Sequence, residues 1–188
     1  TAQVHVARWT MRGEDFKYIE TDQFIVNPPV FTLQPGQKQL VRLSLRSEAG
    51  VEIEGSYRLI LEEVPKSIQP GAIAMLLKVS IPVFVLPAQP VMPHLIWQAS
   101  YNSTGDLKLS VRNDGTAHDR ISSVAIQPGN GPAGAAVPTT ISGYLLPGDS
   151  RDFVITDERL RNARHIALDV VTETAKSHVE LTPTERRE

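Results

Sequence analysis

The chain contains 188 residues with 19 basic and 21 acidic side chains, which gives a formal net charge of −2. That balance leaves no excess of positive charge, so the sequence argues against a nucleic-acid-binding protein. Hydrophobic residues make up 41% and charged residues 21% of the chain, as in a folded globular protein. The absence of cysteine excludes disulfides, zinc–thiolate sites, iron–sulfur clusters and thiol catalysis.

Alternation of apolar and polar residues, the period of a half-buried β-strand, dominates the sequence. Prolines slightly outnumber glycines, 14 against 12, which favours short elements separated by turns. Pro28 and Pro29 restrict one strand to a sheet edge or a bulge, where a cis X-Pro bond is an option. Before Pro87 we expect five strands, over residues 3–11, 23–33, 38–46, 56–64 and 72–86.

The segment 72–86 holds the longest alternation, and Ile73, Met75, Leu77 and Val79 begin its apolar row. A strand of this length would span on the order of 50 Å, which is well beyond the usual strand. One interpretation is a central strand that packs the core of its own domain. The other is an edge strand whose apolar row is offered to another protein.

A domain boundary is indicated by Pro87, Pro90 and Pro93. Shorter alternating segments follow these prolines, with a loop rich in Gly, Ala and Pro at 127–138 and one helical turn at 157–161. The pattern predicts an all-β fold of two tandem β-sandwich domains, over residues 1–87 and 88–188.

No arrangement of residues indicates an enzyme. The histidines lack metal-ligand spacing, so we interpret each of them as a packing or surface residue: His5, His94, His118, His165 and His178. The sequence also lacks the motifs of nucleotide-binding loops and of serine hydrolases. We therefore expect a non-enzymatic protein with no cofactor and no metal site.

Five ordered motifs resemble the periplasmic chaperones of pilus assembly, especially the archaic, Csu-type branch. They are FIVNPPVF at 24–31, LxPGQxQLVRL at 33–43, ExxYRL at 54–59, EVP at 63–65 and IPVFVLP at 81–87. The segment VARWT at 6–10 resembles the strand that precedes them in the family. The match is firm over residues 3–87 and loose in the second half.

The resemblance implies two immunoglobulin-like sandwiches in a boot-shaped arrangement, and donor-strand complementation as the function. The strand 72–86 would complete a pilin subunit that lacks the last strand of its own fold, with Ile73, Met75, Leu77 and Val79 in successive pockets. The implied partners are pilin subunits and an outer-membrane usher, and the implied location is the periplasm. The alternative is a two-domain extracellular immunoglobulin-like module, structural or carbohydrate-binding, in which the row is buried within the chain.

One departure from the family concerns the anchor of the subunit. Classical members of that family hold the subunit's terminal carboxylate with two basic residues, one of them a lysine at the position that matches Pro82 here. Arg42, Arg58 and Lys78 are the candidate replacements, because arginine binds a carboxylate through two parallel hydrogen bonds. The competing interpretation is that these are solvated charges on the sheet surface.

A further departure concerns the first domain, which by the resemblance lacks its first two strands, A1 and B1. An apolar groove would then be exposed in this domain. Self-association through that groove, or through the edge of the strand 72–86, is a further expectation.

Overall fold

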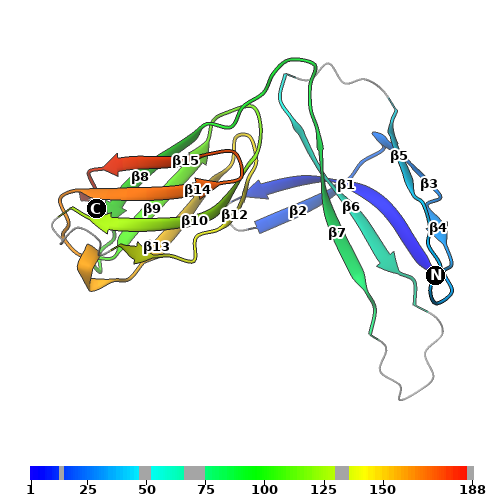
Figure 1. The fold of residues 1–188 in the computed structure, drawn as a ribbon, viewed down its shortest axis with the longest axis horizontal. Helices are drawn as coiled ribbons and strands as arrows, with labels where there is room; N and C mark the ends of the chain where they lie inside the picture. Colours follow the sequence, from blue (N-terminus) through cyan, green and yellow to red (C-terminus); the bar gives the residue numbers. More distant parts are fainter. Residues whose placement is uncertain (13–14, 47–51, 66–74, 130–135, 186–188) are drawn as a thin grey trace. The chain divides into compact units, whose positions relative to one another are not determined.

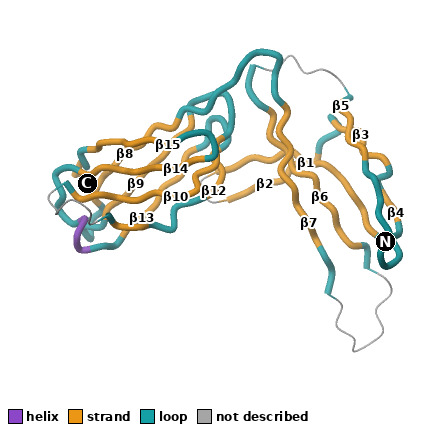
Figure 2. Tube along the Cα trace, in the orientation of Figure 1, coloured by secondary structure: helices purple, strands orange, loops and turns teal. Residues whose placement is uncertain are grey.

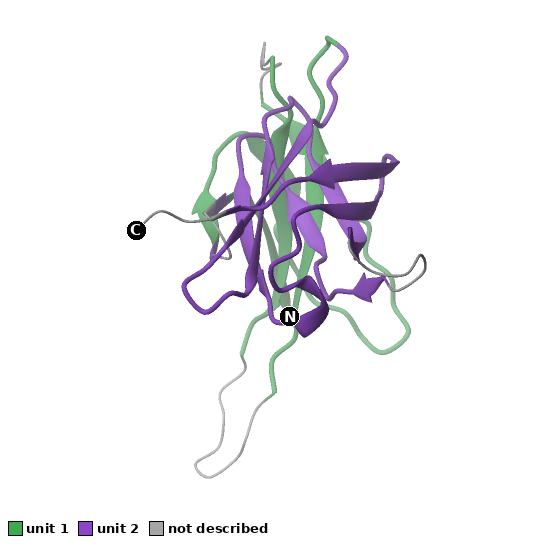
Figure 3. Ribbon diagram, turned by 90° about the vertical axis from the view of Figure 1, so that its left-hand side faces the viewer, with its two compact units in different colours: residues 1–10, 16–89 green, residues 11–15, 90–188 purple. Residues whose placement is uncertain are grey.

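The structure is a computed structural model, and it describes residues 1–12, 15–46, 52–65, 75–129 and 136–185. It is built almost entirely from strands and loops (Figure 1 and Figure 2). Two compact units can be separated, one of residues 1–10 and 16–89 and the other of residues 11–15 and 90–188 (Figure 3). Among the described residues, no helix has the length and hydrophobicity of a membrane span. The expectation of an all-β fold is confirmed.

The described strands before Pro87 form two sheets. The main sheet has the order β2-β1-β6-β7, and β4 also pairs with β1. Its strands are β1 (Ala2–Arg12), β2 (Asp15–Glu20), β4 (Val30–Phe31), β6 (Gly55–Glu63) and β7 (Lys78–Val85). The small sheet consists of β3 (Phe24–Asn27) and β5 (Arg42–Leu45).

The described residues before Pro87 thus hold seven strands where five were expected. The cis bond between Asn27 and Pro28 and the following Pro29 divide the expected strand 23–33 into β3 and β4. Strand β2 was not predicted at all, because all six of its side chains are exposed and show no buried period. The strand expected over 72–86 begins only at Lys78, and residues 72–74 lie outside the described residues.

The inner face of the main sheet is buried on β1, where Val4 and Val6 are almost fully covered. Phe24 of the small sheet packs edge-on against Tyr57 of β6, with ring centroids 4.9 Å apart. This contact identifies the face of the main sheet that the small sheet covers. In the described residues the small sheet has only two short strands, so it cannot cover the whole inner face.

The second unit is a β-sandwich with a well-filled core. One sheet has the order β11-β10-β14-β15 with β12 against β10, and the other has the order β13-β9-β8-β16. Leu109, Ile126, Leu145 and Leu168 are fully buried between the sheets. The elements are β8 (Leu95–Tyr101), β9 (Leu107–Asn113), β10 (Asp119–Pro128), β11 (Val137–Pro138), β12 (Gly143–Leu145), β13 (Ser150–Ile155), η1 (Glu158–Leu160), β14 (Ile166–Thr172), β15 (Lys176–Leu181) and β16 (Thr184–Glu185).

Candidate strand-docking edge

Strand β7 lies at an edge of the main sheet. It pairs antiparallel with β6 from Gly55↔Val85 to Glu62↔Lys78, and no described strand pairs with its other side. Figure 1 shows β7 beside β6 at the end of this sheet. An edge strand presents a row of backbone N–H and C=O groups that a strand of another chain can use.

The hydrogen bonds to β6 show which backbone groups face that open side. The N–H of Glu63 donates to the carbonyl of Leu77 at 2.9 Å, which makes these residues a hydrogen-bonded pair. Hydrogen-bonded and non-hydrogen-bonded pairs alternate along an antiparallel ladder. Leu77, Val79 and Ile81 therefore bond inward to β6, whereas the N–H and C=O groups of Lys78 and Ser80 point to the open edge.

Of the predicted donor row, Val79 lies within β7, next to Ile81 on the same face of the sheet. Val79 pairs with Leu61 and Ile81 with Leu59, so they share the inner face of the sheet with Val4 and Val6. Met75 is 94%, Leu77 62%, Val79 37% and Ile81 49% exposed. Ile73, the first residue of the predicted row, lies outside the described residues.

Val79 and Ile81 continue the inner face of the sheet to its open edge, where their side chains are 37% and 49% exposed. The backbone groups on the open side of β7 can form hydrogen bonds with a strand of another chain. The apolar side chains of β7 can pack against apolar side chains of that strand. The arrangement therefore suits strand addition, in which main-chain bonds hold the partner and alternate side chains fill its pockets.

Two of the three basic candidates lie on the opposite face of the sheet. Arg58 pairs with Pro82, and Lys78 pairs with Glu62, so both point away from the apolar row. The guanidinium carbon of Arg58 lies 3.7 Å from the centroid of the Trp9 ring. Phe84 of β7 and Phe16 of β2 also contact this indole, with ring centroids 6.2 and 6.1 Å away.

Lys78 is held by its neighbour across the ladder. Its Nζ lies 2.5 Å from Oε1 of Glu62, and both side chains are partly exposed. The hydrogen bond from Lys78 lowers the pKa of Glu62, although partial burial opposes the shift. Lys78 already has a carboxylate partner in this structure, so a terminal carboxylate would have to compete with Glu62 for it.

The structure does not bring Arg42 to the other two basic residues. Arg42 is exposed on β5, opposite Asn27, in the small sheet. Phe24 and Leu45 form the pair whose face turns toward Tyr57, and successive pairs alternate in direction. The pair of Asn27 and Arg42 therefore points outward from the sandwich.

Sequence reasoning missed the role of Trp9 in this cluster. The alternation of β1 places Trp9 on the face of His5 and Ala7, and Ala7 pairs with Arg58. Knowledge of the β1–β6 register would have identified the stack. No local sequence pattern indicates that register, because residues 9 and 58 are far apart in the chain.

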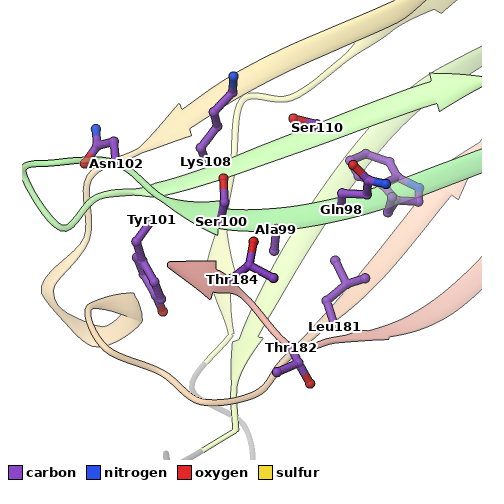
Figure 4. Close-up of a pocket in the computed structure, with 11 residues that line it drawn as sticks. Gln98, Ala99, Ser100, Tyr101, Asn102, Lys108, Ser110, Leu181, Thr182 and Thr184 are labelled. Atoms are coloured by element: carbon purple, nitrogen blue, oxygen red, sulfur yellow. The ribbon is translucent and has the colours of Figure 1, made fainter. Parts of the chain in front are cut away.

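A hollow of about 570 Å³ lies beside the β8 edge of the second unit (Figure 4). Gln98, Ser100 and Thr184 line it, together with Lys108, which forms an ion pair with Asp152 at 2.6 Å. The described residues contain no group of three or more His, Cys, Asp or Glu side chains that could hold a metal ion. The side chains that line the hollow offer polar contacts.

Residues 1–90 match the family model of the pili and flagellar-assembly chaperone, PapD N-terminal domain. No curated protein shows significant sequence similarity to the chain. Solved structures resemble it over nearly its whole length. The chaperone–tip adhesion subunit pre-assembly complex CsuC–CsuE, from the archaic chaperone-usher Csu pili of Acinetobacter baumannii, is 23% identical with a TM-score of 0.64, over 99% of this chain and 85% of that one.

Two further chaperones show the same fold. The class 5 fimbriae chaperone CfaA is 13% identical with a TM-score of 0.63, over 97% of this chain and 85% of that one. The CupB2 chaperone of Pseudomonas aeruginosa is 16% identical with a TM-score of 0.56, over 97% of this chain and 84% of that one. The fold is thus the two-domain, immunoglobulin-like fold of these chaperones, and the match to the PapD N-terminal domain model lies in its first 90 residues.

Proposed function

We propose that the chain is a periplasmic chaperone of pilus assembly, of the archaic Csu type, that binds pilin subunits by adding β7 to their incomplete fold. It holds each subunit until delivery to an outer-membrane usher. Residues 1–87 form the chaperone domain and residues 88–188 the C-terminal immunoglobulin-like domain. The observation that carries the proposal is the open edge of β7 with its exposed apolar row.

Strand addition can bind pilin subunits of different sequence, provided that their pockets fit the apolar side chains of the row. Each side chain of the row that becomes fully buried contributes about 1.5–3 kcal/mol before the cost of ordering is counted. Main-chain hydrogen bonds to Lys78 and Ser80 add affinity that does not depend on the client's side chains. Binding of this kind requires no nucleotide.

We propose Arg58 as the first candidate for the carboxylate anchor. It pairs with Pro82, at the position where other family members carry the lysine, and the Trp9 ring fixes its guanidinium. Lys78 is a weaker candidate because it is engaged by Glu62. Arg42 is the weakest, because it points outward from the small sheet.

The alternative function, a structural or carbohydrate-binding immunoglobulin-like module, requires the row to be buried within the chain. Met75 and Leu77 are instead among the most exposed large hydrophobic side chains of the described residues. The chaperone function therefore accounts for them better.

Co-expression with the pilin subunits of the same gene cluster tests the proposal. We expect the wild-type chain to recover a soluble subunit, and Met75→Asp and Leu77→Asp to lower that recovery about tenfold or more, because each buries a charge in the client's groove. Met92→Asp is the matched control, since Met92 is 73% exposed in the second unit. Equal recovery by all four proteins would contradict strand addition through β7.

A further inference from the structure

Strand β2 lies at the other edge of the main sheet from β7. It pairs with β1 on one side, and no described strand pairs with its other side (Figure 1). All six of its side chains are exposed. Three of them are large and apolar, since Phe16 is 52%, Tyr18 45% and Ile19 51% exposed. Apolar side chains on an open edge strand favour pairing with a strand of another chain.

The two faces of β2 carry different side chains. The ring of Phe16 contacts the ring of Trp9, with centroids 6.1 Å apart, so Tyr18 lies by alternation on the same face. Lys17 and Ile19 lie on the opposite face. The strand therefore presents aromatic rings on one side and, on the other, a single positive charge beside an apolar side chain.

A hollow with an excess of negative charge lies beside β2. Its volume is about 660 Å³, and Arg8, Ile19, Glu20 and Asp22 are among the residues that line it. Arg8 offsets one of the two carboxylates, which leaves the other available to one further cation. The hollow thus suits the ammonium group of a lysine that lies over Ile19.

Symmetry limits the registers in which two copies of β2 can pair. A two-fold axis normal to the sheet relates antiparallel strands and keeps each face on its own side, so one residue pairs with itself. An axis at Lys17 or at Tyr18 pairs β2 over nearly its whole length. The axis at Lys17 would set two ammonium groups opposite each other, which is unfavourable. The axis at Tyr18 pairs the two tyrosines, Phe16 with Glu20 and Lys17 with Ile19.

The axis at Tyr18 also brings opposite charges together. Lys17 of each copy lies over Ile19 of the other, beside the hollow that Glu20 and Asp22 line. The contact forms twice, because the same surface serves both copies. A lysine on an open edge ordinarily discourages pairing, whereas here a second copy supplies the carboxylates that it needs. Charge complementarity therefore identifies a second copy of the chain as the occupant of this edge.

We propose that β2 pairs with β2 of a second copy about a two-fold axis at Tyr18, so that the chain forms a dimer whose two main sheets join into one. The inference goes beyond the proposed function, because the order β2-β1-β6-β7 leaves β7 open at both ends of the joined sheet. The dimer can therefore hold two clients. A single pair of short strands makes a small interface, so the dimer should dissociate on dilution.

Single cysteines in β2 test the register, because the chain contains no cysteine of its own. Tyr18→Cys sets two Cα atoms directly opposite each other at about 4.5–5.5 Å, within disulfide range. Lys17→Cys sets them two residues out of register, at about 8 Å, beyond that range. We expect mild oxidation to cross-link Tyr18→Cys about tenfold more than Lys17→Cys.

Ser44→Cys is the control for cross-linking by chance collision, since Ser44 is exposed on β5 in the small sheet. It should cross-link no more than Lys17→Cys. Equal cross-linking of Tyr18→Cys and Lys17→Cys, or more in Lys17→Cys, would overturn the proposed pairing about Tyr18.

Sedimentation velocity at a series of concentrations measures the association itself. We expect Lys17→Glu to weaken the dimer about tenfold or more, and a chain that also carries Glu20→Lys and Asp22→Lys to regain it to within about threefold. Lys176→Glu should behave as the wild type, because Lys176 is an exposed lysine of the second unit. A wild-type chain that stays monomeric at every concentration, or unchanged association of Lys17→Glu, would overturn the proposal.

Co-expression with pilin subunits separates the dimer from the proposed function. Lys17→Glu should recover soluble subunit as the wild type does, because β2 and β7 lie at opposite edges of the sheet. If Leu77→Asp abolishes association and Lys17→Glu does not, the copies associate through the β7 side of the sheet and the pairing of β2 is wrong. If Leu77→Asp leaves subunit recovery unchanged while Lys17→Glu weakens the dimer, the proposed function fails and the pairing of β2 stands.

Discussion

The guanidinium of Arg58 stacks on the ring of Trp9, at 3.7 Å from the ring centroid. The register of β1 and β6 produces this contact, because Ala7 pairs with Arg58 and Trp9 follows on the same face. Phe84 of β7 packs on the same indole, which is only 2% exposed. Trp9 of β1 therefore contacts side chains of β6 and of β7, the strand at the open edge of the sheet.

The first prediction concerns the stability that this stack contributes. Trp9→Ala should lower the free energy of unfolding of the first unit by about 3–5 kcal/mol, because it removes a buried ring and leaves a cavity. Arg58→Ala should lower it by about 1 kcal/mol, the contribution of a partly exposed cation–π contact. Urea denaturation followed by circular dichroism measures both. Trp97 is the other tryptophan of the chain, and it lies in the core of the second unit. Its fluorescence in Trp9→Ala therefore reports unfolding of the second unit, whose midpoint in urea should not change.

The second prediction separates stability from docking at the β7 edge. Met75→Asp should change the free energy of unfolding by less than about 0.5 kcal/mol, because its side chain is 94% exposed. Val4→Asp places a charge on the buried part of the same sheet face and should prevent folding of the first unit. Thermal unfolding of the two variants checks this. A large loss of stability in Met75→Asp would mean that the row packs within the chain.

The alternation of residues 75–85 predicts one face for Met75, Leu77 and Val79, and the structure places Val79 in β7 on the face that Ile81 shares. The edge position of β7 could not be predicted in the same way, since the order of strands in a sheet depends on contacts between distant residues. The candidate anchors show the same limit. Alternation placed Arg42 and Arg58 on strands, but only the pairing reveals that Arg42 points outward and that Arg58 lies across from Pro82.

Strand lengths were the least predictable feature of the first unit. Apolar alternation continues from residue 72 to residue 86, yet β7 begins at Lys78, because β6 itself ends at Glu63. A strand ends where its partner ends, whatever its own sequence allows. Strand β2 shows the converse case. Its side chains are all exposed, so no alternation of buried residues predicts it, yet pairing with β1 makes it a strand.

The third prediction concerns Asn113, which is fully buried at the end of β9. Its amide nitrogen donates to the carbonyls of Ala117 and Leu145 at 2.8 and 3.0 Å. Its amide oxygen accepts from the N–H of His94 at 3.1 Å and from that of Gly115 at 3.0 Å. The side chain thereby fastens the chain before β8 to the turn after β9.

Asn113→Leu should lower the free energy of unfolding of the second unit by about 3 kcal/mol, because it leaves these buried backbone groups without partners. Calorimetry of the full chain measures the loss as a shift of the second unit's transition. Asn102→Leu is the control, since Asn102 caps an exposed turn through Thr104 and Asp106, and its replacement should have a smaller effect. Equal losses in the two variants would contradict the central role of Asn113.

The fourth prediction concerns the pH dependence of the second unit. Burial raises the pKa of Asp149 to about 6, although a hydrogen bond with the backbone of Leu146 opposes the shift. In the unfolded chain the group has its ordinary value of 3.8. Between these two values the folded chain retains a proton that the unfolded chain has released. The stability that this group contributes is therefore complete below pH 3.8 and is lost as the pH rises through about 6.

Asp149→Asn should accordingly stabilise the second unit at pH 7, by about 1 kcal/mol after allowance for the partial exposure of the side chain. The gain should disappear as the pH falls below 3.8, where the carboxyl group becomes neutral in both states and resembles the amide. Thermal unfolding of both proteins between about pH 3 and pH 8 measures it. Asp152→Asn is the control, because Asp152 pairs with Lys108 and its replacement should give no gain at pH 7. A constant difference between Asp149→Asn and the wild type at every pH would show that burial does not shift this carboxyl group.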